Sequence, residues 1–114
     1  MTQYTPRKGD FVHLSFSPQE GHEFAGPHYG LVISADIFSV ATGLAMVCPI
    51  TSKTDKVSGF QVTVPPGSYK VRGVVLSSEV RTVDYGARGM TFEGKAPNAL
   101  VETVVHNICQ IITN

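Results

Sequence analysis

The chain has 114 residues, no net formal charge at pH 7, 42% hydrophobic residues and 16% charged residues. This length is close to the commonest size of one domain, and it is too short for a core plus an independent second domain. The composition is too apolar for a disordered chain, and no run approaches the roughly 18 apolar residues that span a membrane. We therefore expect one globular domain over residues 1–114 that does not enter the membrane.

The N-terminus and the cysteines indicate the cellular compartment. The first ten residues, MTQYTPRKGD, lack the apolar central stretch of a secretory signal peptide. The two cysteines, Cys48 and Cys109, lie in apolar stretches and have no partner at the spacing of a metal site or a redox pair. We expect a cytoplasmic protein in which both thiols are buried.

Three strands are predicted in the first half of the chain. Residues 10–16 alternate with the two-residue period of a strand, and a second strand is expected over residues 29–34, which contain the run Leu-Val-Ile. Residues 44–50 alternate again, with one proline inside the run. Residues 36–42 have no clean period, so no regular element is predicted there.

The second half of the chain predicts three more strands and one helix. The strands are expected over residues 60–64, 71–76 and 80–85, with turns rich in Pro, Gly and Ser between them. Pro97 suits the first position of a helix. Apolar side chains then recur at helical spacing, at Leu100, Val101, Val104, Val105, Ile108, Ile111 and Ile112. The expected fold is mostly β, a small barrel of short strands with one C-terminal α-helix packed against it.

A loop before the second strand concentrates titratable side chains. The segment EGHEFAGPHYGLVI, residues 20–33, contains Glu20, His22, Glu23, His28 and Tyr29. Its three glycines and one proline exclude a regular helix, and the loop is longer than the usual connection of about 4–6 residues. Such a loop can shape a pocket while its far end is held by the strand.

Two kinds of site fit this loop poorly. His22, Glu23 and His28 are of metal-ligand types, but a zinc protease needs two histidines one helical turn apart, and here the interval HExxxxH contains Gly and Pro. A nucleophilic triad lacks a suitable serine, and Cys48 lies in an apolar strand that disfavours the thiolate. His13 and His106 are expected to be solvated surface side chains. We predict no metal and no cofactor.

Acid–base chemistry on an anionic substrate remains. Residues 51–95 carry seven Lys or Arg against four Asp or Glu, while the rest of the chain sums to −3. Cleavage of RNA through its own 2′-hydroxyl needs a proton acceptor, a proton donor and groups that stabilise negative charge on phosphorus. The candidate groups are Glu23, His28, Thr51, Ser52, Lys53, Arg81 and Arg88. The alternative is a loop of incidental polar residues without chemistry.

Four segments in order resemble the MazF/PemK family of toxin endoribonucleases. They are PRKGDFVHLSFSP, GHEFAGPHYGLVIS, TGLAMVCPITSK and GVVLSSEVRTVDYGARG, which together span about residues 6–89. They resemble the family's RGD-x-V strand, its GHEQxGxRPALVLS loop, its VxPIT hinge and its late VR-x-x-D-x-x-AR segment. The resemblance implies an SH3-like barrel of the MazF/CcdB type, a homodimer, cytoplasmic single-stranded RNA as substrate, and a cognate antitoxin with an acidic disordered segment.

The resemblance also implies roles for single residues. The family's loop glutamate corresponds to Glu23 and its catalytic threonine to Thr51, while the late arginines correspond to Arg81 and Arg88. The family's catalytic loop arginine corresponds to His28, so an imidazole stands where a guanidinium is expected. This departure is consistent with His28 acting as acid or base itself, and also with a weak or altered enzyme. An imidazole titrates near neutrality, which favours proton transfer.

Two other functions stay open. A non-enzymatic inhibitor on the same barrel, like the CcdB gyrase poisons, acts through a C-terminal tail containing tryptophan, whereas this chain has no Trp and ends Ile-Ile-Thr-Asn. The other is an RNA-binding barrel that has lost catalysis through the change at His28. Cleavage of a long RNA separates these functions from an endoribonuclease.

Overall fold

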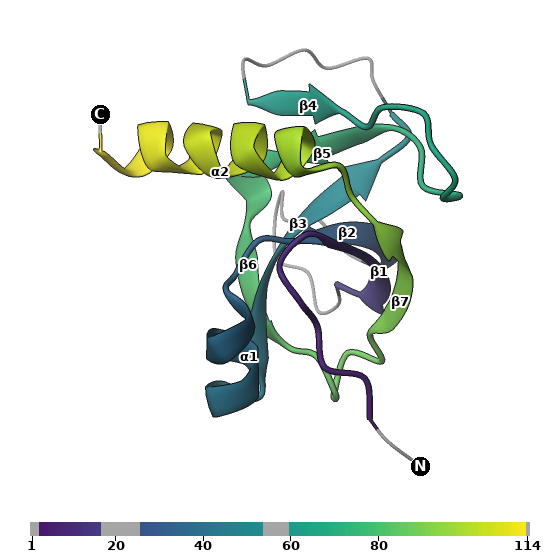
Figure 1. Cartoon of the computed structure of the whole chain (residues 1–114), viewed down its shortest axis with the longest axis vertical. Coiled ribbons are helices and arrows are strands. Elements are labelled where there is room, and N and C mark those ends of the chain that lie inside the picture. The colour runs from purple at the N-terminus through teal and green to yellow at the C-terminus, as the bar shows by residue number, and fades with distance from the viewer. Residues whose placement is uncertain (1–2, 17–25, 54–59, 114) are drawn as a thin grey trace.

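The structure, a computed structural model, describes residues 3–16, 26–53 and 60–113. Its elements in chain order are β1 (Asp10–Ser15), β2 (Pro27–Val32), α1 (Asp36–Thr42), β3 (Leu44–Thr51), β4 (Gln61–Thr63), β5 (Val74–Leu76), the 3₁₀ turn η1 (Ser77–Glu79), β6 (Arg81–Asp84), β7 (Thr91–Lys95) and α2 (Asn98–Thr113). Figure 1 shows a coiled sheet with α2 lying across one side of it and α1 beside the start of β3. The predicted mostly-β fold with a C-terminal helix is confirmed.

All strands belong to one antiparallel sheet with β3 at its centre. The order is β4-β5-β3-β2-β1-β7, and β6 pairs with the first half of β3 while β5 pairs with its end. β3 is long enough for both pairings because it has eight residues, and its other edge pairs with β2. In the described part of the chain the end strands β4 and β7 do not pair, so the barrel remains an open, curled sheet.

The central strands bury both of their faces. Alternation along β1 sends Phe11 to one hydrophobic cluster and sends Val12 and Leu14 to another. The cluster under α2 contains Phe11, Leu31, Ile33, Cys48, Ile50, Val64, Val71, Val75, Ala96, Leu100, Val101, Val104 and Ile108. The cluster inside the curled sheet contains Val12, Leu14, Phe16, Val32, Ala45, Val47, Val83 and Met90. Polar side chains of these strands are therefore restricted mostly to the strand ends.

Two elements are absent from the sequence-based prediction. α1 is a short helix ended by Gly43 in the left-handed conformation, and its outer side chains Ile37 and Val40 are exposed, which obscures any helical period. β7 is an edge strand with a register shift opposite Phe11, where Gly94 has φ of 137°. A bulged edge strand does not show clean alternation, and this explains why the pattern did not predict it.

The end of α2 also differs from expectation. Leu100, Val101, Val104 and Ile108 pack into the core, as their helical spacing predicts. Beyond them the helix continues past the sheet (Figure 1), so Ile111 and Ile112 are exposed, and so is the Cys109 thiol. The prediction that Cys109 is buried is wrong, while Cys48 is buried as predicted.

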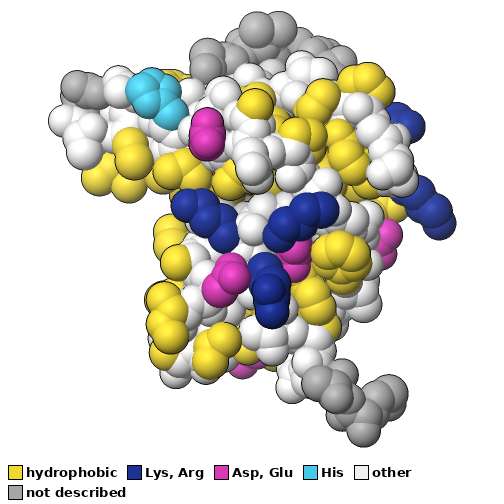
Figure 2. All heavy atoms as spheres, in the orientation of Figure 1, with side chains coloured by type: hydrophobic (Ala, Val, Ile, Leu, Met, Phe, Trp, Pro, Cys, Tyr) yellow, Lys and Arg dark blue, Asp and Glu magenta, His cyan; other side chains and the backbone are white. Residues whose placement is uncertain are grey.

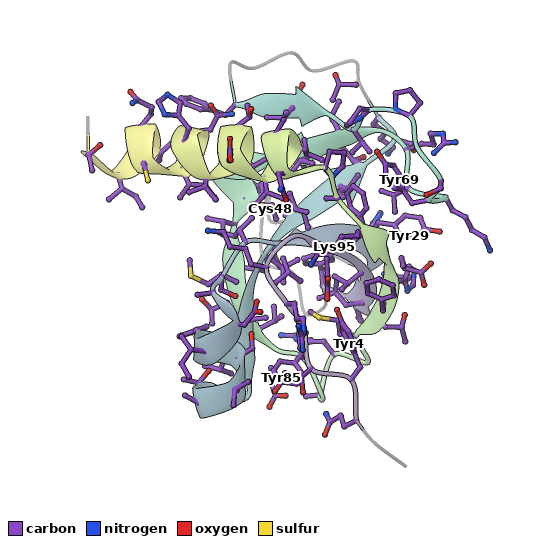
Figure 3. The ribbon with its side chains drawn as sticks, viewed as in Figure 1. Tyr4, Tyr29, Cys48, Tyr69, Tyr85 and Lys95 are labelled. Carbon is purple, nitrogen blue, oxygen red and sulfur yellow. The ribbon has the colours of Figure 1, made fainter. Side chains whose placement is uncertain are left out.

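A buried carboxylate of β1 ties the N-terminal segment to β7. Asp10 accepts hydrogen bonds from the Tyr4 hydroxyl at 2.5 Å, from the Arg7 amide at 3.0 Å and from the Lys95 ammonium at 3.0 Å. Tyr4 and Lys95 are labelled in Figure 3. Burial raises the pKa of Tyr4, and the hydrogen bond to Asp10 and the charge of that carboxylate raise it further. The buried charge is thus compensated by a cation and two neutral donors.

Gly30 provides a test of the packing inside the curled sheet. A Cβ on Gly30 would lie 2.5 Å from Val47 Cγ1 and 3.3 Å from Leu14 Cδ2. Because a well-packed core accommodates an added methyl only by displacing its neighbours, Gly30→Ala should lower the free energy of unfolding by about 1–3 kcal/mol. Urea titration followed by circular dichroism measures this change.

Two variants make that test specific. Gly30→Ala combined with Val47→Ala removes the shortest contact, so the pair should cost less than the sum of the two single changes. Gly86→Ala is the control, since its methyl would collide only with the flexible end of the Gln3 side chain and would lie at an ordinary 3.5 Å from Asp84 Oδ1. Equal stability of Gly30→Ala and the parent protein would contradict the packing described here.

Candidate functional site

An open pocket of about 350 Å³ lies where β1, β2 and the end of β3 meet the loop between β4 and β5. Its lining residues are His13, Pro27, His28, Tyr29, Ile50, Ser52, Lys70 and Arg72. Among these described lining residues there are two imidazoles, two cations and one aliphatic hydroxyl, and no carboxylate. Such a lining favours an anionic ligand that exchanges protons.

The sheet register places the side chains on the floor of the pocket. His13 of β1 is opposite Tyr29 of β2, which in turn is opposite Ile50 of β3. Paired residues of antiparallel strands project to the same face, so these three form a row. The His13 and Tyr29 rings meet edge to face with centroids 5.4 Å apart. His28 is opposite Leu14, one position along from this row, and it also lines the pocket.

The loop over residues 64–73 supplies both cations. The Tyr69 ring packs edge to face on Phe11 with centroids 4.7 Å apart, and its hydroxyl donates to the Pro65 carbonyl. Val71 is fully buried, so the alternate residues Lys70 and Arg72 are left exposed on the pocket side. Figure 2 shows Lys and Arg side chains projecting at the edge where this loop lies in Figure 1. The apolar anchors thereby hold two positive charges over the pocket.

Arg72 is further restrained by its own loop. Its Nη1 donates to the Tyr69 carbonyl at 2.9 Å and to the Val71 carbonyl at 3.0 Å. Arg72 therefore both stabilises the loop and presents a guanidinium to the pocket. The Lys70 side chain is exposed. In Figure 3 the labelled Tyr29 and Tyr69 appear on the same side of the molecule, which is the side of the pocket.

The end of β3 contributes hydroxyl groups at the rim. Thr51 pairs with Val74, and its hydroxyl accepts a hydrogen bond from the Lys53 amide at 3.1 Å. Gly73 is essential to this approach, because it has φ of 117° and a Cβ on it would lie 2.1 Å from the Thr51 carbonyl oxygen. Ser52 follows directly and lines the pocket. Lys53 is exposed and does not line it.

The two late arginines lie outside the pocket. Arg81 donates to the Phe16 carbonyl at 3.1 Å, and its guanidinium carbon lies 5.3 Å from the centroid of the Phe16 ring. Arg88 holds a turn through its backbone, with its amide 3.0 Å from the Asp84 carbonyl oxygen and its carbonyl oxygen 3.1 Å from the Ser15 amide. Both arginines were predicted to belong to one site with His28, but only His28 lines the pocket.

The family assignment rests on nearly the whole chain. The pattern of the family described as "PemK-like, MazF-like toxin of type II toxin-antitoxin system" matches residues 7–112. This chain belongs to the PemK/MazF toxin family. The match includes the four segments on which the sequence resemblance was based, apart from Pro6 at the start of the first, so that resemblance is confirmed.

Named relatives and solved structures agree with the PemK/MazF assignment. The chain is 30% identical over 101 residues to Endoribonuclease toxin MazF of Escherichia coli K12, covering 88% of each chain. It is 32% identical over 108 residues to Endoribonuclease toxin ChpB of the same strain, covering 92% of each chain. A crystal structure of MazF from Deinococcus radiodurans is 33% identical, with a TM-score of 0.91 over 98% of this chain and 100% of that one. The predicted MazF-type fold is confirmed.

Within this family member, the predicted site residues have three different outcomes. The structure brings His28 and Ser52 together in the pocket and places Thr51 directly beside Ser52. Lys53, Arg81 and Arg88 do not line it. Glu23, with the rest of residues 17–25, lies outside the described residues.

The sequence-based prediction of the site missed the three other basic lining residues, His13, Lys70 and Arg72. Lys70 and Arg72 alternate with the apolar Tyr69 and Val71, a pattern that could have indicated two outward cations. The expectation that His13 is a solvated surface side chain is wrong, because it is partly buried beneath the pocket. His106 on α2 is exposed, as predicted.

Three other kinds of feature bear on the function: a nucleophilic cysteine, a metal-binding cluster and a membrane-spanning helix. Burial raises the pKa of the Cys48 thiol to about 12, so this cysteine is poorly suited to act as a nucleophile. Within residues 3–16, 26–53 and 60–113, no three His, Cys, Asp or Glu side chains gather closely enough to hold a metal ion. No helix in the described part of the chain is long and apolar enough to cross a membrane.

Proposed function

We propose that this chain is the toxin of a type II toxin–antitoxin pair and a metal-independent endoribonuclease that cuts single-stranded RNA, including mRNA, in the cytoplasm. The observation that carries the proposal is the pocket in which His28 and Ser52 face the cations Lys70 and Arg72 without a carboxylate in the described lining. Family membership and the names of the MazF and ChpB relatives support the same function. They give no support to a gyrase poison.

The chemistry follows from the groups in the pocket. The substrate 2′-oxygen attacks the adjacent phosphorus as its proton leaves, and the bond from phosphorus to the 5′-oxygen breaks as that oxygen takes up a proton. The products are a 2′,3′-cyclic phosphate and a 5′-hydroxyl. The transition state gains negative charge on phosphorus, which Lys70 and Arg72 stabilise and which hydroxyl donors such as Ser52 and Thr51 can approach. His28 transfers a proton, and Glu23 is a further predicted participant.

Charge and proton transfer are thus separated in this proposed enzyme. In the family pattern an arginine occupies the loop position where this chain has His28. The Arg72 guanidinium and the Lys70 ammonium provide positive charge from a different loop of the same chain. The imidazole at position 28 is then available for proton transfer, which a permanently protonated guanidinium cannot perform.

The reaction products test the proposed mechanism. We expect the purified protein to cut a long RNA in the presence of EDTA and to leave 2′,3′-cyclic phosphate and 5′-hydroxyl ends, read by end-specific labelling and mass spectrometry. A substrate with a single 2′-deoxy nucleotide at the cut site should resist cleavage. His28→Ala, purified in parallel, is the control for contaminating ribonuclease and should be slower by about 10²–10⁴-fold.

Two results would overturn this mechanism. Cleavage of the 2′-deoxy substrate at the same position shows that another nucleophile operates. If the protein binds RNA but cuts none of several RNA sequences, it is not an endoribonuclease. The remaining function is then that of an RNA-binding barrel that has lost catalysis.

The role of the loop cations is tested by the salt dependence of RNA binding. The slope of log K against log salt is negative, and each lost phosphate contact on a single strand decreases its magnitude by about 0.7. We expect Lys70→Ala and Arg72→Ala each to show this decrease with a non-cleavable 2′-O-methyl oligonucleotide, measured by fluorescence anisotropy. Arg7→Ala removes an equal charge from an exposed residue that does not line the pocket, and is the control.

Stability must be measured in the same variants. Because Arg72 donates to two loop carbonyls, Arg72→Ala also lowers thermal stability, whereas Lys70→Ala should not. An unchanged salt slope for Lys70→Ala would remove the loop from the proposed RNA interface.

We also propose a homodimer and a cognate antitoxin with an acidic, partly disordered segment. Large apolar side chains are exposed on α1, Ile37 and Val40, and at the end of α2, Ile111 and Ile112 (Figure 2). Such surface is typical of protein–protein contacts. A MazE–MazF crystal structure from Deinococcus radiodurans contains a chain with a TM-score of 0.82 and 34% identity to this one. An acidic partner segment is complementary to Lys70 and Arg72.

The mass in solution tests the dimer. Light scattering at micromolar concentration should give twice the chain mass of 12.3 kDa. The mass of a single chain under these conditions would contradict the proposal.

A further inference from the structure

A second histidine lines the same pocket as the one already discussed. His13 is partly buried, lines the pocket, and belongs to β1, whereas His28 belongs to β2. Side-chain packing alone does not require a histidine at position 13, because its ring contact with Tyr29 is an edge-to-face contact that any aromatic ring can make. The position therefore combines a structural contact with a titratable group that the proposed reaction has not yet used.

The register sets the relation between the two imidazoles. His13 is opposite Tyr29, and His28 is opposite the next residue of β1, Leu14. Side chains alternate along paired strands, so the Cβ atoms of His13 and His28 leave the sheet in opposite directions. Both residues nevertheless line the same pocket, which lies near the start of β2. They thus approach one pocket from two directions.

This arrangement suits an in-line displacement at phosphorus. The attacking 2′-oxygen and the departing 5′-oxygen lie on opposite sides of the phosphorus, and each exchanges a proton. One group cannot readily reach both oxygens at once. Two imidazoles that enter from different directions can each serve one oxygen while the cations hold the phosphate between them.

The charged groups around His13 come from each neighbouring element. Across β1 on the other side is Thr91 of β7, whose hydroxyl lies 3.5 Å from a carboxylate oxygen of Glu93. The loop contributes Lys70 and Arg72, while β2 contributes the phenol of Tyr29 and the His28 imidazole. The cations bind the phosphate, and the two histidines of the described lining are of the residue type that most often acts as a general acid or base.

The geometry points to His13 and His28 as a general acid–general base pair for RNA cleavage in this pocket. One neutral imidazole takes the proton from the 2′-hydroxyl, and the other, protonated, gives a proton to the 5′-oxygen. Proton number and charge balance, because one imidazole gains a proton as the other loses one. This inference rests on the proposed endoribonuclease function and adds His13 as a catalytic residue.

The pH dependence of cleavage provides the first test. For the parent protein we expect a bell-shaped profile of kcat/KM with both limbs near neutrality. His13→Phe keeps an aromatic ring for Tyr29 but cannot transfer a proton, so it should lose one limb and about 10²–10⁴-fold in kcat. His28→Asn should lose the other limb. His106→Asn, on the exposed face of α2, is the matched control and should keep the parental profile.

A substrate with sulfur in place of the bridging 5′-oxygen assigns the two roles. A thiolate leaves without protonation, so this substrate no longer needs the general acid. We expect it to restore the rate of one of the two variants, His13→Phe or His28→Asn, and not of the other. Restoration of both variants, or of neither, would overturn the paired assignment.

The outcomes also separate this inference from the function on which it rests. If the parent protein cleaves RNA and a normally folded His13→Phe cleaves at the parental rate with both limbs present, only the role of His13 is refuted. If His13→Phe loses stability in a thermal melt, His13→Ala, which leaves room for a free imidazole, replaces it, and failure of added imidazole to restore any rate counts against the proposal. If the parent protein does not cleave RNA, both proposals are refuted.

Discussion

Burial of both faces of the central strands is the constraint on which this molecule depends. β1, β2 and β3 contribute side chains to the core under α2 and also to the core inside the curled sheet. Buried apolar surface stabilises a fold by roughly 25 cal/mol per Å², so a chain of this size gains from using both faces of its few strands. The size of side chains inside the sheet is therefore tightly limited. At Gly30 even a methyl group would collide with Val47.

The same constraint explains where the pocket lies. With both faces occupied by apolar groups, polar side chains of the central strands are concentrated toward the strand ends. There His13, His28 and Ser52 gather, next to a loop that is itself fastened to the core by Tyr69 and Val71. The pocket is therefore bordered by the sheet on one side and by an anchored loop on the other. Its charges are held in place by hydrophobic contacts beneath them.

Arginine illustrates how position decides the role of a residue type. Arg81 donates a hydrogen bond to the Phe16 carbonyl and lies over the Phe16 ring, so it connects two segments of the chain. Arg72 also donates to carbonyls, but it remains exposed at the pocket. In the proposed reaction this allows positive charge to come from the loop while His28, which replaces the arginine of the family pattern, transfers a proton. The change at position 28 is then a redistribution of roles rather than a loss.

The sequence by itself determined the family, the mostly-β fold and the C-terminal helix, because alternation, helical spacing and ordered motifs are local properties. It did not reveal α1 or the bulged β7, in which exposed apolar residues and Gly94 break the local period. Only the tertiary structure decided that His13 lines the same pocket as His28, and that Lys70 and Arg72 line it while Arg81 and Arg88 do not. The reason is physical: strand register and the anchoring of a loop by distant core residues determine which side chains meet, and neither is encoded in the spacing of the side chains along the chain.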